Sequence, residues 1–147
     1  MSDKQSERQG WLARLEERLF AASMPQLVQG MRNEAATSYR EMVRDLATPM
    51  APALEREVAR TLNRGGDREL IPAETLMPEM MQRFDLAAED FGADEATHFA
   101  ELQAVCNRCP TVGRCWRAMR GGEGWAKCRG FCPNAEAFEK KALAVAG

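Results

Sequence analysis

The chain has 147 residues, enough to bury a hydrophobic core as one domain or as a small domain with an appended helical segment. Hydrophobic residues make up 45% and charged residues 29%, as in globular proteins, and no apolar run approaches the roughly 18 residues that would span a membrane. The net charge of −2 excludes no class of partner, but the polar N-terminus lacks the apolar core of a secretory signal. We therefore expect a cytoplasmic protein without a membrane helix.

Helical periodicity runs through the N-terminal part of the chain. Apolar residues at helical spacing predict amphipathic helices at 11–20, 27–46 and 54–62, and the first is expected to stop near Ser23 and Pro25. These apolar stripes are typical of helices that pack in a core. A coiled coil or a partner-binding surface is the alternative interpretation.

Paired glycines at Gly65-Gly66 interrupt the helical pattern, and the composition changes beyond them. We place a boundary there. The prediction is an N-terminal amphipathic helical extension over residues 1–66 and a helical, cysteine-rich, metal-binding domain over residues 67–147.

Further helices are predicted beyond this boundary: one from Met77 that stops near Gly92, and others at 94–106, 112–119 and 134–145, with Asp94 and Asn134 as N-cap residues. No segment shows the two-residue alternation of a strand. We therefore predict an all-α fold, a small helical bundle with a C-terminal, loop-rich module that binds metal through four cysteines.

Five cysteines cluster in the last third of the chain: Cys106, Cys109, Cys115, Cys128 and Cys132. Cytosolic reductants disfavour disulfides, so thiolate ligands are the better interpretation. Cys-x2-Cys alone is a common step that brings two sulfurs to one side of a helical turn, and the further cysteines make the set a strong indication of metal. Four cysteines complete a tetrahedral site or a cubane cluster and leave one over.

Proline follows two of these cysteines, in Cys109-Pro110 and Cys132-Pro133. This ending is typical of cluster-binding runs, where proline turns the chain away and removes a competing N–H donor. Zinc knuckles more often place glycine after the second cysteine of a pair. The sequence therefore favours a [4Fe–4S] cluster, with Zn²⁺ as the alternative cofactor and a metal-free thiol sensor third.

We take Cys106, Cys109, Cys115 and Cys132 as the cofactor and metal ligands. Cys128 is the candidate substitute for Cys132 as the fourth ligand. Its other interpretations are a resolving thiol and a buried small hydrophobic residue.

The order Cys-x2-Cys-x5-Cys, an aromatic residue, a Gly-rich gap and Phe-Cys-Pro-Asn-Ala resembles a small bacterial family classed as a domain of unknown function. The likeness covers residues 71–143 and leaves the N-terminal helices as an extension. It implies that the recurring cysteines fall at Cys106, Cys109, Cys115 and Cys132. It implies no activity and does not decide between metals.

Six cations and one carboxylate, Glu123, lie between the first and last cysteines; the cations are Arg108, Arg114, Arg117, Arg120, Lys127 and Arg129. A four-thiolate site carries a net charge of about −2, so such cations would balance it and bias its potential. Glycines in this segment are expected to expose N–H groups to the sulfurs.

Nucleic acid is the rival explanation of the basic segment, because Trp116, Trp125 and Phe131 could stack on bases. We expect these aromatic side chains to cover the metal instead, and we expect a protein partner rather than nucleic acid.

His98 is the only histidine, and no phosphate-binding loop is present, so a conventional catalytic site is not expected. The favoured function is a small non-catalytic iron–sulfur protein, a redox, electron-transfer or sensing accessory to a larger partner. The alternative is a structural zinc module that mediates protein interactions and, with less support, nucleic-acid binding.

Overall fold

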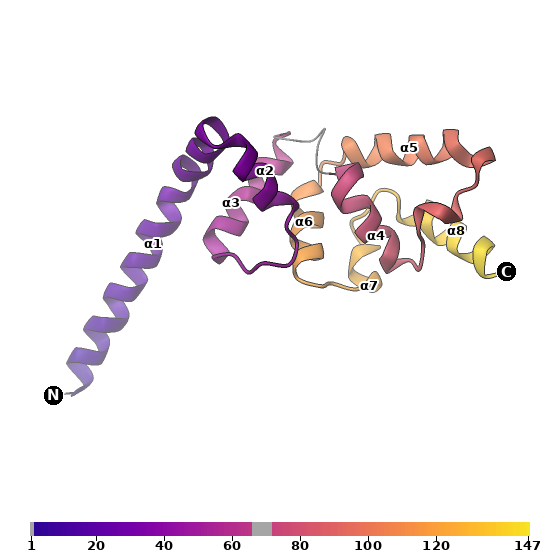
Figure 1. Ribbon diagram of the computed structural model, residues 1–147. Helices are drawn as coiled ribbons and strands as arrows, with labels where there is room; N and C mark the ends of the chain where they lie inside the picture. Colours follow the sequence, from indigo (N-terminus) through magenta and orange to yellow (C-terminus); the bar gives the residue numbers. More distant parts are fainter. Residues whose placement is uncertain (1, 66–71) are drawn as a thin grey trace.

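The computed structural model describes residues 2–65 and 72–147 (Figure 1). Within these ranges every regular element is helical and no strand occurs, which confirms the all-α fold. The α-helices are α1 (Ser2–Glu34), α2 (Ala36–Arg44), α3 (Pro52–Asn63), α4 (Met77–Arg83), α5 (Ala96–Asn107), α6 (Val112–Arg120), α7 (Trp125–Cys128) and α8 (Ala135–Ala146). A π-helical turn, η1 (Pro72–Leu76), leads directly into α4, and short 3-10 turns precede α5.

The first helix is much longer than predicted. It continues through Pro25, so the predicted stop near Ser23 and Pro25 is wrong. Proline removes one helical hydrogen bond, but Met24 and Val28 on either side are buried, and this packing holds the helix together. The chain bends instead at Ala35, whose φ of −136° is not helical, so the predicted helix at 27–46 is divided between α1 and α2.

The N-terminal half of α1 extends away from the other helices (Figure 1). Its apolar residues Trp11, Leu15 and Leu19 are exposed, so the prediction that the 11–20 stripe packs in the core is wrong. The stripes of α2 and α3 do pack in the core, through residues such as Tyr39 and Val58.

Three boundaries in the C-terminal part also differ from prediction. α4 ends at Arg83 rather than near Gly92, because Asp85 takes a left-handed φ of 57° and the Leu86 N–H bonds back to the Met81 carbonyl. Asp94 lies in a 3-10 turn and does not cap α5. The single-turn helix α7 was not predicted.

One hydrophobic core runs through the described residues on both sides of the predicted boundary, since Val43 and Val58 belong to the same cluster as Trp116 and Phe138. Gly65, with φ 100°, follows the end of α3, and Gly66 lies outside the described residues. Among the described residues, no helix combines the length and the apolar character that crossing a membrane requires.

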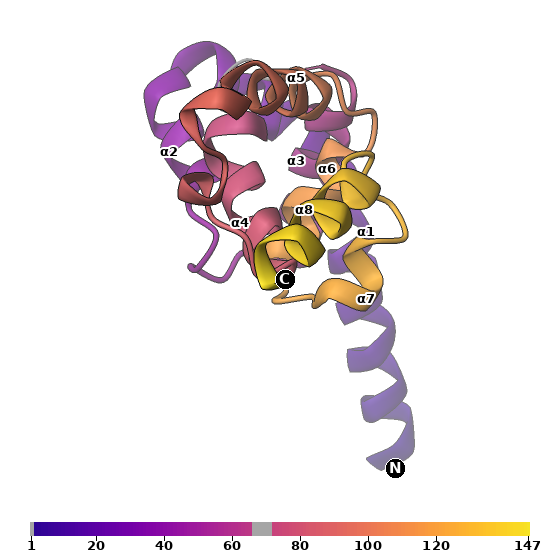
Figure 2. The ribbon, with the colours of Figure 1, turned by 90° about the vertical axis from the view of Figure 1, so that its right-hand side faces the viewer.

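The cysteines lie on or between the C-terminal helices, from α5 to the start of α8. Figure 2 looks toward the C-terminus, where α8 lies among α4, α5 and α7. The Phe84 ring of the α4 end and the Phe138 ring of α8 meet with centroids 5.5 Å apart. This contact fixes α8 beside α4 and closes one side of the cysteine pocket described below.

Candidate functional site

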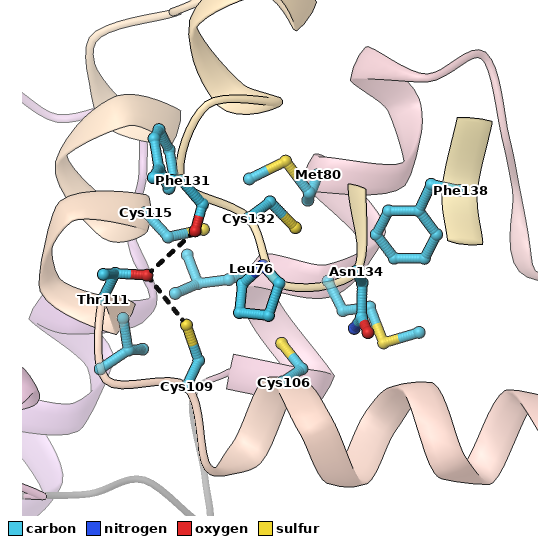
Figure 3. Close-up of a pocket in the computed structure, with 13 residues that line it drawn as sticks. Leu76, Met80, Cys106, Cys109, Thr111, Cys115, Phe131, Cys132, Asn134 and Phe138 are labelled. Atoms are coloured by element: carbon cyan, nitrogen blue, oxygen red, sulfur yellow. Dashed lines mark hydrogen bonds between the residues drawn. The ribbon is translucent and has the colours of Figure 1, made fainter. Parts of the chain in front are cut away.

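Four sulfur atoms face one pocket, as Figure 3 shows. They belong to Cys106, Cys109, Cys115 and Cys132, the four residues selected from the sequence. We call this space the cysteine pocket. Its other walls are mostly apolar, formed by Leu76, Met77, Met80, Val112, Phe131 and Phe138. The structure thus gathers these four thiols around one water-poor space.

Three chain segments supply the cysteines. Cys106 lies in the last turn of α5, and the N–H of Cys109 bonds to the Cys106 carbonyl at 3.2 Å, so the chain turns tightly between them. Cys115 is in the first half of α6. Cys132 precedes α8. The cysteine pocket therefore depends on how α5, α6 and α8 are held together.

The N-terminal helices hold α6 in place. The backbone N–H of Gly113 donates to Asn63 Oδ1 at 2.7 Å, and α3 passes so close that a Cβ on Gly113 would lie 2.1 Å from the Ala59 carbonyl oxygen. One turn further along α6, Trp116 Nε1 donates to the Val43 carbonyl at 2.8 Å. Since Cys115 lies between these two anchors, its position is set by helices far away in the sequence.

Arg120 adds a third anchor at the end of α6. Its guanidinium donates to the carbonyls of Asp45 and Thr48 and pairs with Glu55, and it stacks over the Trp116 ring. Only 5% of its side chain is exposed, so these bonds work in a largely dry environment. The end of α6 is therefore tied to the loop between α2 and α3.

Cys132 sits at the start of α8. Its sulfur accepts hydrogen bonds from the backbone N–H groups of Asn134 and Ala135, which favour the thiolate. Asn134 occupies the predicted N-cap position, but its side chain donates to the Leu102 carbonyl of α5 at 2.9 Å rather than capping α8. This bond holds Cys132 near the helix that carries Cys106.

Thr111 was not identified from the sequence. Its hydroxyl oxygen lies 3.1 Å from Cys109 Sγ and 3.4 Å from the Phe131 carbonyl oxygen, so it links two walls of the pocket (Figure 3). A hydroxyl residue two positions after a candidate ligand is a sequence signal that could have found it.

Burial disfavours the charged forms of the Cys106, Cys115 and Cys132 thiols. It raises the pKa of Cys106 to about 12 and that of Cys132 to about 11, and the neighbouring cysteine sulfurs add to both shifts. Burial also raises the pKa of Cys115, with contributions from Cys106 and Cys132. Without a cation among them, these side chains are thiols at neutral pH.

Cys128 is placed differently. It is fully buried and does not line the cysteine pocket, and its Sγ lies 3.7 Å from the Glu123 carbonyl oxygen. Its thiol pKa is also raised, first by burial. The structure separates this side chain from the wall that the other four share.

The aromatic residues expected around the site divide into three cases. Phe131 lines the cysteine pocket, Trp116 is buried against Val43 away from it, and Trp125 is 44% exposed. The prediction that all three cover a metal at this site is therefore wrong for Trp116 and Trp125, and it stays a prediction for Phe131. The N–H groups that reach Cys132 come from Asn134 and Ala135 and not from the glycines.

The described residues contain no group of three or more His, Cys, Asp or Glu side chains arranged to hold a metal ion. His98 is half exposed beside Glu101 and does not line the pocket.

Comparison of the chain with models of protein families, with curated proteins and with solved structures found no match in any of the three. The resemblance drawn from the cysteine spacing therefore stays a prediction.

Proposed function

We propose that the chain binds one [4Fe–4S] cluster through Cys106, Cys109, Cys115 and Cys132 and serves a larger protein as a non-catalytic redox, electron-transfer or sensing accessory. One observation carries this proposal: four thiols from three segments face a single, mostly apolar pocket. The fifth cysteine, Cys128, lies outside it.

The Cys109-Pro110 and Cys132-Pro133 pairs support a cluster more than a single zinc ion. A structural Zn²⁺ requires all four sulfurs at about 2.3 Å from one point. In a [4Fe–4S] cluster each cysteine binds a different iron, so the sulfurs line the wall of a larger space. Four thiols on the wall of one pocket are compatible with the second arrangement.

The pocket also has the surroundings that a cluster needs. Its apolar walls, such as Leu76, Met80 and Phe138, exclude water, and hydrogen bonds to the sulfurs are among the levers that set a cluster's potential. The Thr111 hydroxyl and the N–H groups of Asn134 and Ala135 can supply such bonds. A bound cluster would supply one-electron redox chemistry.

Because the pKa values of three of these thiols are raised, binding of the cluster must release protons from them. Metal ligation needs thiolates, so the cations of the cluster would have to overcome the burial of Cys106, Cys115 and Cys132. A reducing compartment such as the cytoplasm would keep these thiols available for ligation.

Anaerobic purification followed by absorption spectroscopy and by iron, sulfide and zinc assays tests the proposal. We expect a brown protein with about four irons and about four sulfides per chain. A colourless protein with one tightly bound zinc per chain would contradict it and support the structural zinc module. Loss of the fold on chelation would then be the expected behaviour of that alternative.

A further inference from the structure

A groove between α3 and α6 carries a concentration of arginines that the sequence does not reveal. Arg56 and Arg60 of α3 line it opposite Arg114 and Arg117 of α6, and all four side chains are exposed. Two glutamates, Glu55 and Glu123, complete its charged lining. We call this surface the arginine groove. Its positive excess contrasts with the chain's overall charge of −2.

We propose that the arginine groove is the docking surface for an acidic segment of a partner protein. Guanidinium groups form paired hydrogen bonds with carboxylates, and arginine is enriched in protein interfaces. Positive and negative surfaces also attract one another before contact and so speed association.

Of the two glutamates in the lining, Glu123 opposes the charge of the four arginines, whereas Glu55 is already engaged. Glu55 is occupied within the fold, because it pairs with Arg120 at 3.2 Å and with Arg117 at 3.4 Å. The Arg60 guanidinium lies 3.6 Å from the mostly buried carboxylate of Glu57. Arg56 and Arg114 are left as the groove's strongest attraction for an external carboxylate, one on each wall.

Arg114 connects the groove to the cysteine pocket. Its guanidinium carbon lies 4.8 Å from the centre of the Phe131 ring, and Phe131 lines the pocket. Arg114 also directly precedes Cys115 in α6. A partner bound in the groove would thus contact Arg114, which stacks on one wall of the cysteine pocket. The inference rests on the proposed function, because the protein that docks in the groove is the larger partner that the cluster would serve.

An acidic protein fits the groove better than nucleic acid. Trp116 is fully buried and hydrogen-bonded to Val43, so it cannot stack on a base, and Phe131 is already covered by Arg114.

Binding of a fluorescent ten-residue glutamate peptide to the full-length protein, measured by anisotropy at low and at physiological salt, tests the inference. We expect binding at low salt that weakens as salt rises, and at least tenfold weaker binding by Arg56→Gln/Arg114→Gln. The matched control is Arg8→Gln/Arg14→Gln, which removes two exposed arginines from α1 and should bind like the wild type.

An equal loss of peptide affinity in both double variants would overturn the inference, because the net charge of the protein alone would then explain binding. Unchanged binding by Arg56→Gln/Arg114→Gln would overturn it as well. If the double variant fails to fold, Arg56→Gln is tested alone. It lies outside the cysteine segment and should still weaken binding of the peptide. A ten-nucleotide single-stranded DNA that binds more tightly than the peptide, with the same arginine dependence, would replace the protein partner by nucleic acid. Metal analysis of the same samples keeps this outcome separate from a failure of the cluster proposal.

Discussion

Trp116 Nε1 donates a hydrogen bond of 2.8 Å to the backbone carbonyl of Val43. These residues are 73 positions apart, and the bond joins the helix that follows the α1 bend to the helix that carries Cys115. The N-terminal segment is thus part of the support of the cysteine pocket, even though it contains no cysteine.

Trp116→Phe keeps an aromatic ring but removes the donor. The buried Val43 carbonyl loses its partner, so we expect the free energy of unfolding to fall by about 1–3 kcal/mol. Urea denaturation measures this change. Trp125→Phe is the control, because Trp125 is 44% exposed and its replacement should leave stability within about 0.5 kcal/mol of wild type. Equal effects of the two substitutions would argue against the anchoring role.

Gly113→Ala should separate α6 from α3. The added methyl group would lie 2.1 Å from the Ala59 carbonyl oxygen, a backbone atom that cannot move independently. We expect a loss of about 1–3 kcal/mol in stability and a lower metal content, because Cys115 lies two residues further along α6. Gly30→Ala in α1 meets nothing within 4 Å and should keep or increase stability. Full stability of Gly113→Ala would show that the helices are further apart than described.

The stability of the reduced, metal-free protein should fall at alkaline pH. The pKa of Cys106 is raised to about 12 and that of Cys132 to about 11, from an ordinary value of 9.0. The folded state therefore holds these protons more tightly than the unfolded state, and its advantage is complete below pH 9 and is lost as the pH rises toward 11 and 12.

Urea denaturation of the metal-free protein at pH 7 to 10.5 measures this dependence. Cys106→Ser/Cys132→Ser should show a weaker decline over the same range. A decline of the same size in this variant would mean that other groups cause it. Metal loading should show the opposite trend, with tighter binding as pH rises, because ligation releases protons.

Asp45 lies in the loop held by Arg120, and its lowered pKa predicts a loss of stability at acid pH. The side-chain hydrogen bond with Thr48 and the N–H groups of Ala47 and Thr48 lower the pKa of Asp45 from 3.8 to about 2. Its ionised form therefore stabilises the fold above about pH 4, and this contribution is lost as the pH falls toward 2. Asp45→Asn should be less stable than wild type at pH 7, and the difference should shrink below pH 4. A difference that does not change with pH would contradict the assignment.

The helical class and the approach of Cys106 to Cys109 could be predicted from sequence, because both depend on local spacing. Periodicity reports amphipathic helices directly, and Cys106 and Cys109 are brought together by a single turn. The course of α1 through Pro25 could not be predicted in the same way, since it depends on the burial of Met24 and Val28 by distant helices.

The support of the site is also a property of the folded chain. Gly113 reads as a flexible position in the sequence, whereas in the structure it is the point where α3 approaches α6 most closely. Arg56 and Arg60 are more than 40 residues from the cysteines, and only the packing of α3 on α6 brings them to the groove with Arg114.

Iron content in two serine variants tests the central claim most directly. Cys115→Ser removes a sulfur that faces the pocket, and Cys128→Ser removes the one that does not. After identical anaerobic reconstitution, the account predicts wild-type iron and sulfide in Cys128→Ser and loss of most of both in Cys115→Ser, with circular dichroism confirming that each variant is folded. Loss of iron from a folded Cys128→Ser together with its retention in Cys115→Ser would contradict the account.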